Sequence, residues 1–105
     1  MQRGDIYTLR PPRRPGHEQQ GRRFGVVVQS DALLPRSVIV IAPTSRSARP
    51  ASFRPEVVIE GEATKVLVEQ VGAVDVNCLG DHVGLTSPEE MWGIDESLMT
   101  VVGLH

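Results

Sequence analysis

The sequence predicts a mainly β domain that ends in one α-helix, built as a small, curled barrel of mostly antiparallel strands. Two observations predict it: short β-branched runs recur between Pro- and Gly-rich loops, and a helical stripe follows Ser87. With 105 residues, 40% of them hydrophobic, the chain is long enough for one domain, residues 1–105, with one core. Only 4% of residues are aromatic, so self-association would help to complete the burial.

Six short segments are expected to be strands because they are apolar or β-branched and are bounded by turn residues. They are residues 5–9, 24–29, 38–42, 56–60, 64–68 and 70–74. Residues 24–29 and 38–42 are continuous apolar runs, typical of strands covered on both faces, and form the core of the sheet. Gly61-Glu62 is the expected turn of a hairpin. Residues 75–79 are expected to form one helical turn, which Gly80 closes.

Two basic loops interrupt this pattern, at residues 10–22 and 46–55. The first contains Pro11-Pro12 and Pro15-Gly16, which exclude both a helix and ladder pairing. It is long for a small domain, and long loops in compact domains are usually functional or disordered. We therefore treat residues 10–22 as a candidate substrate flap.

The C-terminus carries the clearest helix. Ser87 can cap it, Pro88 suits the first helical position, and Glu90 closes a capping box. Four apolar side chains then recur on one stripe, namely Met91, Ile94, Leu98 and Val101. Trp92 and Met99 widen that face, so the helix either packs deeply on the barrel or joins an oligomer interface, and we favour packing.

The net charge of −2 hides an uneven distribution. Residues 1–55 hold ten Arg and three acids, a balance of +7, whereas residues 56–105 hold one Lys and ten acids, a balance of −9. Arginine contacts release counterions from nucleic acid and can be bidentate to phosphate, so the split favours a basic face for an anionic polymer. A preference for Arg over Lys also follows from a GC-rich genome, but the split along the chain does not.

Several classes of protein are disfavoured by what the sequence lacks. Cys78 is the single cysteine, so an intrachain disulfide is impossible. His17, His82 and His105 lack the spacing of a metal site, and we expect neither a metal nor another cofactor. The first residues have no apolar signal core, and no run approaches the roughly 20 apolar residues that span a bilayer. We therefore expect a cytoplasmic protein that does not insert into membranes.

Two stretches place polar side chains where strands begin or end. Residues 16–23, Gly-His-Glu-Gln-Gln-Gly-Arg-Arg, run into the strand at 24–29, and Pro43-Thr44-Ser45 follows the run at 38–42. A rigid sheet can hold catalytic groups in fixed geometry while a loop admits a substrate. We expect the two stretches to be halves of one site.

These stretches belong to a longer series of fragments spread over nearly the whole chain. The fragments are Arg3-Gly4-Asp5-Ile6-Tyr7, Gly16-His17-Glu18-Gln19, Val28-Gln29-Ser30-Asp31, Pro43-Thr44-Ser45, Glu69-Gln70, Leu79-Gly80, Val83-Gly84-Leu85 and Ser87-Pro88-Glu89. Their order resembles that of the MazF/PemK toxins of bacterial toxin–antitoxin systems. The resemblance implies an SH3-like barrel, related to the gyrase poison CcdB, that forms a homodimer.

The resemblance also implies an activity. Toxins of this family are mRNA interferases that cut single-stranded RNA without a metal: the ribose 2′-OH attacks the adjacent phosphorus and leaves a 2′,3′-cyclic phosphate and a 5′-OH. Arg23 aligns with the family's catalytic arginine and would stabilise the developing dianion. Thr44 aligns with the catalytic threonine and would donate to the same oxygens. Glu18 is the candidate base, or orients Arg23. His17 is a possible acid or base, or simply a solvated loop residue.

Six further residues are expected to contact RNA, namely Arg13, Arg14, Arg22, Ser45, Arg46 and Gln70. The alternative for the arginines is a solvated rim. Phe24 stands where the family usually has Pro, and it is either core, which we favour, or a platform on which a base stacks.

The resemblance also implies a protein partner. This is an antitoxin whose acidic, disordered tail folds onto the basic groove and mimics RNA. A second reading of the function remains open: a noncatalytic, protein-binding toxin of the same fold, such as a gyrase poison, or a relative whose catalysis has decayed.

Overall fold

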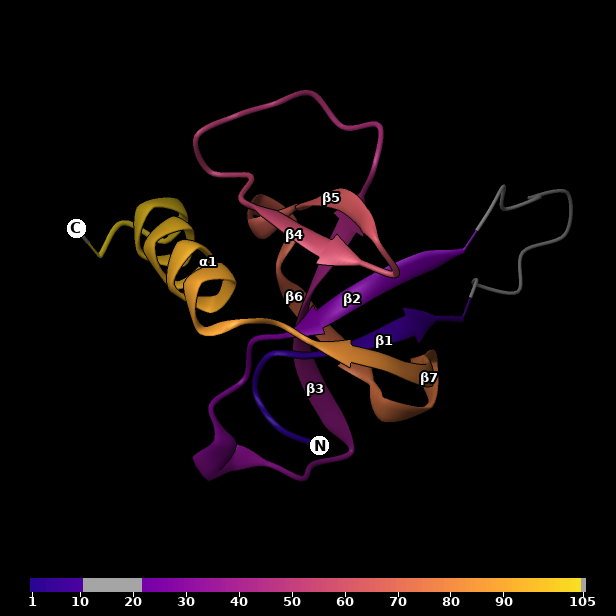
Figure 1. The fold of residues 1–105 in the computed structure, drawn as a ribbon. Helices are drawn as coiled ribbons and strands as arrows, with labels where there is room; N and C mark the ends of the chain where they lie inside the picture. The colour runs from indigo at the N-terminus through magenta and orange to yellow at the C-terminus, as the bar shows by residue number, and fades with distance from the viewer. Residues whose placement is uncertain (11–21, 105) are drawn as a thin grey trace, which may run out of the picture.

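The computed structural model describes residues 1–10 and 22–104, and the strands of this part of the chain form one curled antiparallel arrangement with a C-terminal helix (Figure 1). The strands are β1 (Asp5–Leu9), β2 (Arg23–Val27), β3 (Val38–Ser45), β4 (Glu56–Ile59), β5 (Glu62–Val66), β6 (Gly72–Asp75) and β7 (Leu79–Leu85). The helix is α1 (Pro88–Val101), and the short 3₁₀ turns are η1 (Asp31–Leu33), η2 (Val68–Gln70) and η3 (Val76–Cys78). The predicted fold class, mainly β with a C-terminal helix, is confirmed.

The long strand β3 organises the sheet. Its residues 38–41 pair with β6, residues 41–43 pair with β2, and Thr44 and Ser45 pair with β5. The resulting order is β4-β5-β3-β2-β1-β7, so β4 and β7 are the two ends of this path. Because β3 changes partner along its length, its last residues lie next to the β4–β5 hairpin as well as to β2.

The segment around β7 differs from the prediction. The expected turn over residues 75–79 is present as η3, but Gly80 does not close it, because β7 begins at Leu79 and pairs with β1. Glycines inside β7 weaken the pattern by which a strand is recognised. β7 needs glycine at position 80 because Thr8 of β1 lies so close that a Cβ atom there would collide with its hydroxyl.

The β4–β5 hairpin was predicted, but its turn lies one residue earlier than expected. Ile59 pairs with Glu62, so the turn residues are Glu60 and Gly61. Both have positive φ, 52° and 80°, the combination that a type I′ turn requires. This shift places one carboxylate on each side of Gly61, at the tip of the hairpin.

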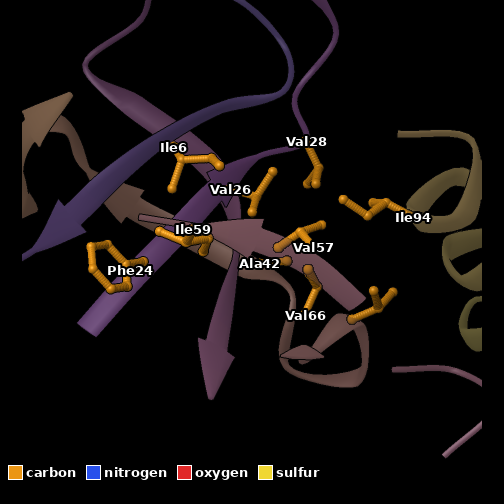
Figure 2. Close-up of a cluster of buried hydrophobic side chains, with 10 residues drawn as sticks. Ile6, Phe24, Val26, Val28, Ala42, Val57, Ile59, Val66 and Ile94 are labelled. Carbon is orange, nitrogen blue, oxygen red and sulfur yellow. The ribbon is translucent and has the colours of Figure 1, made fainter. Parts of the chain in front are cut away.

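The main core lies inside the curled sheet, and the helix contributes to it at one end (Figure 2). Phe24 and Val26 of β2 point into it with Ile94 of α1, and all three are at most 2% exposed. Val27, the next residue of β2, belongs to a second cluster with Ile39. Alternate residues of β2 are therefore buried on opposite faces, as the continuous apolar run predicted. Phe24 is a core residue, the favoured alternative.

The capping box of α1 is confirmed. The Ser87 hydroxyl accepts a hydrogen bond from the Glu90 backbone N–H at 3.1 Å, and the Glu90 carboxylate accepts one from the Ser87 N–H at 2.8 Å. The other oxygen of Glu90 accepts the N–H of Val58 in β4 at 2.6 Å. One carboxylate therefore caps the helix and also ties it to the edge strand β4.

The expected apolar face of α1 is only partly buried. Ile94 is fully buried, and Met91 and Leu98 pack against the core around it. Trp92 is 67% exposed and Val101 is 36% exposed, so the prediction that the widened face packs on the barrel is wrong for these two side chains. Among the described residues, no helix is long and apolar enough to cross a membrane.

Candidate functional site

A groove of about 430 Å³ opens where β2 begins and β3 ends. Six of the residues that line it come from these two segments, namely Arg22, Arg23, Phe24, Thr44, Ser45 and Arg46. Ser47 and Thr64 complete the lining. The two stretches expected to be halves of one site therefore do meet, at those of their residues that the structure describes.

The register of the sheet explains this meeting. β2 and β3 are antiparallel, and Gly25 pairs with Pro43. Continuing that register toward the start of β2 sets Phe24 opposite Thr44 and Arg23 opposite Ser45. Residues about twenty positions apart in sequence thus reach the same groove through backbone pairing alone.

Thr44 is held rigidly in this groove. Its side chain is buried, with 4% of the residue exposed, and its hydroxyl donates a hydrogen bond of 3.1 Å to the backbone carbonyl of Phe24. The hydroxyl proton is therefore directed at the protein. A phosphate oxygen that receives it must replace the Phe24 carbonyl as acceptor.

Arg23 differs from the other arginines that line the groove in that its side chain has no partner among the described residues. Its side chain is exposed, and it makes no hydrogen bond or ion pair with any residue of the described segments 1–10 and 22–104. A guanidinium carries five donors and keeps its charge at physiological pH. Arg23 can therefore bind an anion without first breaking a contact to the described part of the chain.

The two arginines beside Arg23 are both paired. Arg22 Nη1 lies 2.7 Å and 3.0 Å from the two carboxylate oxygens of Glu60, and its guanidinium carbon lies 5.2 Å from the centre of the Phe24 ring. Arg46 Nη1 lies 3.0 Å from a carboxylate oxygen of Glu62. Glu60 and Glu62 lie on either side of Gly61 at the tip of the β4–β5 hairpin, which therefore pairs both arginines that flank Arg23.

The charge split along the sequence is largely folded together in space. Four arginines of the first half form ion pairs with acids of the second half: Arg3–Asp95, Arg22–Glu60, Arg46–Glu62 and Arg54–Glu69. In the last pair, hydrogen bonding from Arg54 holds the pKa of Glu69 below its ordinary value. Within segments 1–10 and 22–55, the arginines therefore do not form a continuous basic face.

The other expected site residues are placed differently. Arg13, Arg14, His17 and Glu18 lie outside the residues that the structure describes. Gln70 is exposed in η2 and is not among the residues that line the groove. Two lining residues, Ser47 and Thr64, were not predicted. Thr64 reaches the groove from β5, and the pairing of β5 with the end of β3 had no local signal in the sequence.

A second polar cluster lies on β1 and β7. The buried Asp5 carboxylate accepts the backbone N–H of Gln2 at 2.7 Å and lies 3.0 Å from His82 Nε2. Burial and the Asp5 charge raise the pKa of Tyr7, whose ring meets that of His82 edge to face at 5.2 Å. Among the described residues, no three His, Cys, Asp or Glu side chains converge as a metal site would require.

The curled sheet with a terminal helix is the fold of a class of small bacterial toxins. A solved mycobacterial endoribonuclease, in complex with its cognate antitoxin, superposes with a TM-score of 0.80 at 20% identity, over 100% of this chain and 97% of the other. The model of the family described as PemK-like, MazF-like toxins of type II toxin–antitoxin systems matches residues 2–102. The chain belongs to this family, and the resemblance is confirmed.

Two relatives are similar in sequence. A candidate toxin of Mycobacterium tuberculosis, Rv3098A, is 39% identical over 90 residues, which are 85% of this chain and 84% of the relative. Endoribonuclease MazF of Staphylococcus saprophyticus is 31% identical over 113 aligned positions, covering 100% of this chain and 93% of the relative.

Proposed function

We propose that this chain is the toxin of a type II toxin–antitoxin system and a metal-independent endoribonuclease that cuts single-stranded RNA, chiefly mRNA, and so inhibits translation and growth. Family membership and the endoribonuclease relatives support the proposal. The observation that carries it is the groove lined by both Thr44 and Arg23, whose guanidinium has no partner among the described residues. The toxin acts as a single domain over residues 1–105, in the cytoplasm, where mRNA is translated.

The reaction is a transesterification. The ribose 2′-OH loses its proton and attacks the adjacent phosphorus, the bond to the 5′ oxygen breaks, and that oxygen takes up a proton to leave as a 5′-OH. Negative charge grows on the two nonbridging oxygens as the phosphorane forms. Fixed donors aimed at that charge stabilise the transition state more than the ground state.

Arg23 and Thr44 are the proposed donors to those oxygens. The guanidinium offers two parallel N–H bonds to a phosphate, and no partner in the described part of the chain holds it back. The Thr44 hydroxyl turns from the Phe24 carbonyl to a nonbridging oxygen, and the buried position of Thr44 keeps it from drifting. Glu18 is proposed as the base, or as the group that orients Arg23, and His17 as a further acid or base.

The RNA strand is proposed to run along the groove. Arg22, Ser45 and Arg46 also line the groove, and we propose that they contact phosphates next to the reacting one. Arg13, Arg14 and Gln70 are proposed as more distant contacts. Phe24 does not serve as a platform for bases, because its ring is buried, whereas the guanidinium of Arg22 lies over that ring.

Two protein partners belong to the proposal. A second copy of the chain forms a homodimer, for which the exposed Trp92 on α1 offers apolar surface. A cognate antitoxin with an acidic, disordered tail is proposed to lie on the arginines of the groove, where its carboxylates would take the places of phosphates.

Cleavage of a long RNA in the presence of EDTA tests the proposed reaction. We expect discrete fragments whose new 5′ ends are hydroxyls and whose 3′ ends are cyclic phosphates. RNA that stays intact at high protein concentration would contradict the proposal. Growth inhibition that survives both Arg23→Ala and Thr44→Val would favour the noncatalytic, protein-binding reading instead.

A further inference from the structure

We infer that Glu60 and Glu62 form a charge gate on the groove: in the free protein they hold the two arginines that flank Arg23, and a polyanion must displace both carboxylates to bind. The inference rests on the proposed function, in that RNA is the polyanion. It assigns a role in substrate binding to the β4–β5 hairpin, which carries neither of the proposed catalytic donors.

The geometry makes the two carboxylates direct competitors of phosphate. Both oxygens of Glu60 engage one nitrogen of Arg22, at 2.7 Å and 3.0 Å, and Glu62 engages one nitrogen of Arg46 at 3.0 Å. A phosphate that binds either arginine through Nη1 needs the same N–H donors, and a phosphate on the other nitrogens is repelled by the carboxylate that stays beside it. Both arginines line the groove, so the competition takes place at its walls.

The hairpin cannot follow the arginines far when they move. Ile59 and Thr64, on the two sides of the turn, are 2% and 1% exposed, and the turn residues have the φ values of a tight type I′ turn. The carboxylates therefore stay near the groove when their arginines turn to a phosphate. Binding a strand separates each pair rather than shifting it as a unit.

Both pairs are weak enough to exchange. The side chains are well exposed, with 56% and 38% for Arg22 and Glu60 and 48% and 58% for Arg46 and Glu62. Ion pairs at such exposure contribute little and are screened by salt. A single small anion can release only one arginine at a time, whereas consecutive phosphates of one strand can release both. The gate therefore favours a polymer over a mononucleotide.

The gate also changes the salt dependence of binding. An arginine that neutralises a phosphate releases a counterion from RNA, but the carboxylate it leaves behind takes up a cation from solution. The two effects partly cancel in the wild-type protein. Removing the carboxylates removes this cation uptake. The slope of log K against log salt concentration then becomes steeper, by up to about one unit of slope for each ion pair removed.

The experiment measures the binding of a long, cleavage-resistant 2′-fluoro RNA, from about 50 to 200 mM salt, to Glu60→Gln, Glu62→Gln and the double variant. Asp95→Asn is the matched control, because it removes one carboxylate from an arginine, Arg3, that does not line the groove. We expect roughly two- to fivefold tighter binding per gate substitution at low salt, a steeper salt slope, and a change below about twofold in the control.

Unchanged or weaker binding by the double variant, with an unaltered unfolding midpoint, overturns the inference and would make the carboxylates supports that position the arginines. A parallel titration with inorganic polyphosphate separates this outcome from a failure of the proposed function. If the wild-type protein does not bind RNA, the proposed function is wrong. The gate is then judged on polyphosphate alone, where tighter binding by the variants supports it and equal binding overturns it.

Discussion

The hydroxyl of Thr44 donates a hydrogen bond of 3.1 Å to the backbone carbonyl of Phe24, the residue that directly follows Arg23. This bond fastens the end of β3 to the start of β2. Thr44 is buried there and Arg23 is exposed, so one groove presents a fixed hydroxyl and a guanidinium that no residue of segments 1–10 and 22–104 pairs. The same bond links the stability of the strand pair to the chemistry proposed for the groove.

Replacing Thr44 with Val tests both roles of the hydroxyl. The variant leaves the Phe24 carbonyl without its donor, so we expect the free energy of unfolding to fall by about 1 kcal/mol in a urea titration. If the hydroxyl also donates to the phosphorane, the RNA cleavage rate falls by roughly 10²–10³. Thr44→Ser keeps the hydroxyl and should retain most of the rate. Equal rates for the Val and Ser variants would limit Thr44 to a structural role.

Replacing Arg23 with Ala should separate activity from stability. The Arg23 side chain has no hydrogen bond or ion pair within the described residues, so the unfolding free energy should change by less than about 0.5 kcal/mol. The RNA cleavage rate should fall by roughly 10²–10³ because one charged donor to the transition state is lost. Arg23→Lys should cleave at a rate between those of the wild type and Arg23→Ala, since lysine keeps the charge but lacks the planar guanidinium. Arg36→Ala, an exposed arginine that does not line the groove, is the control, and full activity in Arg23→Ala would refute the assignment.

The Arg54–Glu69 pair should make stability depend on pH. Hydrogen bonding from Arg54 at 2.8 Å lowers the pKa of Glu69 in the folded protein below its ordinary value of 4.5. The unfolded state therefore takes up a proton first as the pH falls. The stabilisation is complete above the unfolded pKa and is lost as the pH falls through the lower, folded pKa.

Urea unfolding of wild type and Glu69→Gln over a pH series measures this effect. We expect the difference in unfolding free energy to be largest near neutral pH and to shrink below pH 4.5. Arg54→Met should show the same trend, since it breaks the pair from the other side. A difference that stayed constant with pH would contradict the assignment.

Glu90 should matter more for stability than its neighbour Glu89. The Glu90 carboxylate accepts the N–H groups of Ser87 and Val58, and Glu90→Ala leaves both without this acceptor. We expect a loss of about 1–3 kcal/mol of unfolding free energy. Glu89→Ala, in the same first turn but exposed, should cost less than about 1 kcal/mol. Equal losses in urea titrations would show that the link to β4 contributes nothing.

Local sequence patterns predicted a strand or helix correctly where the interactions that form it are themselves local. β1 was predicted with its observed bounds, and the cap and start of α1 follow from Ser87 and Glu90, three residues apart. β7 was missed because two glycines break its pattern, although pairing with β1 stabilises it. The exposure of Trp92 was also missed, because helical periodicity gives the width of an apolar face but not the extent of the surface opposite it.

For the candidate site, order along the chain predicted which strand ends meet but not how their charges pair. The meeting of Arg23 and Thr44 follows from adjacent antiparallel strands. The pairing of Arg22 with Glu60 and of Arg46 with Glu62 could not be predicted, because it depends on a one-residue shift of a hairpin turn and on β3 changing partner.

The sequence by itself determined that this chain is a mainly β toxin of the PemK-like, MazF-like family with an arginine and a threonine at paired strand ends. Apolar periodicity, turn residues and capping residues can each be recognised in a few consecutive residues, and they predict the strands, turns and helix. Only the tertiary structure decided which arginines of the groove form ion pairs and which has no partner in the part of the chain that is described. Ion pairs form across strands that are distant in sequence, and the curvature of the whole sheet sets their distances.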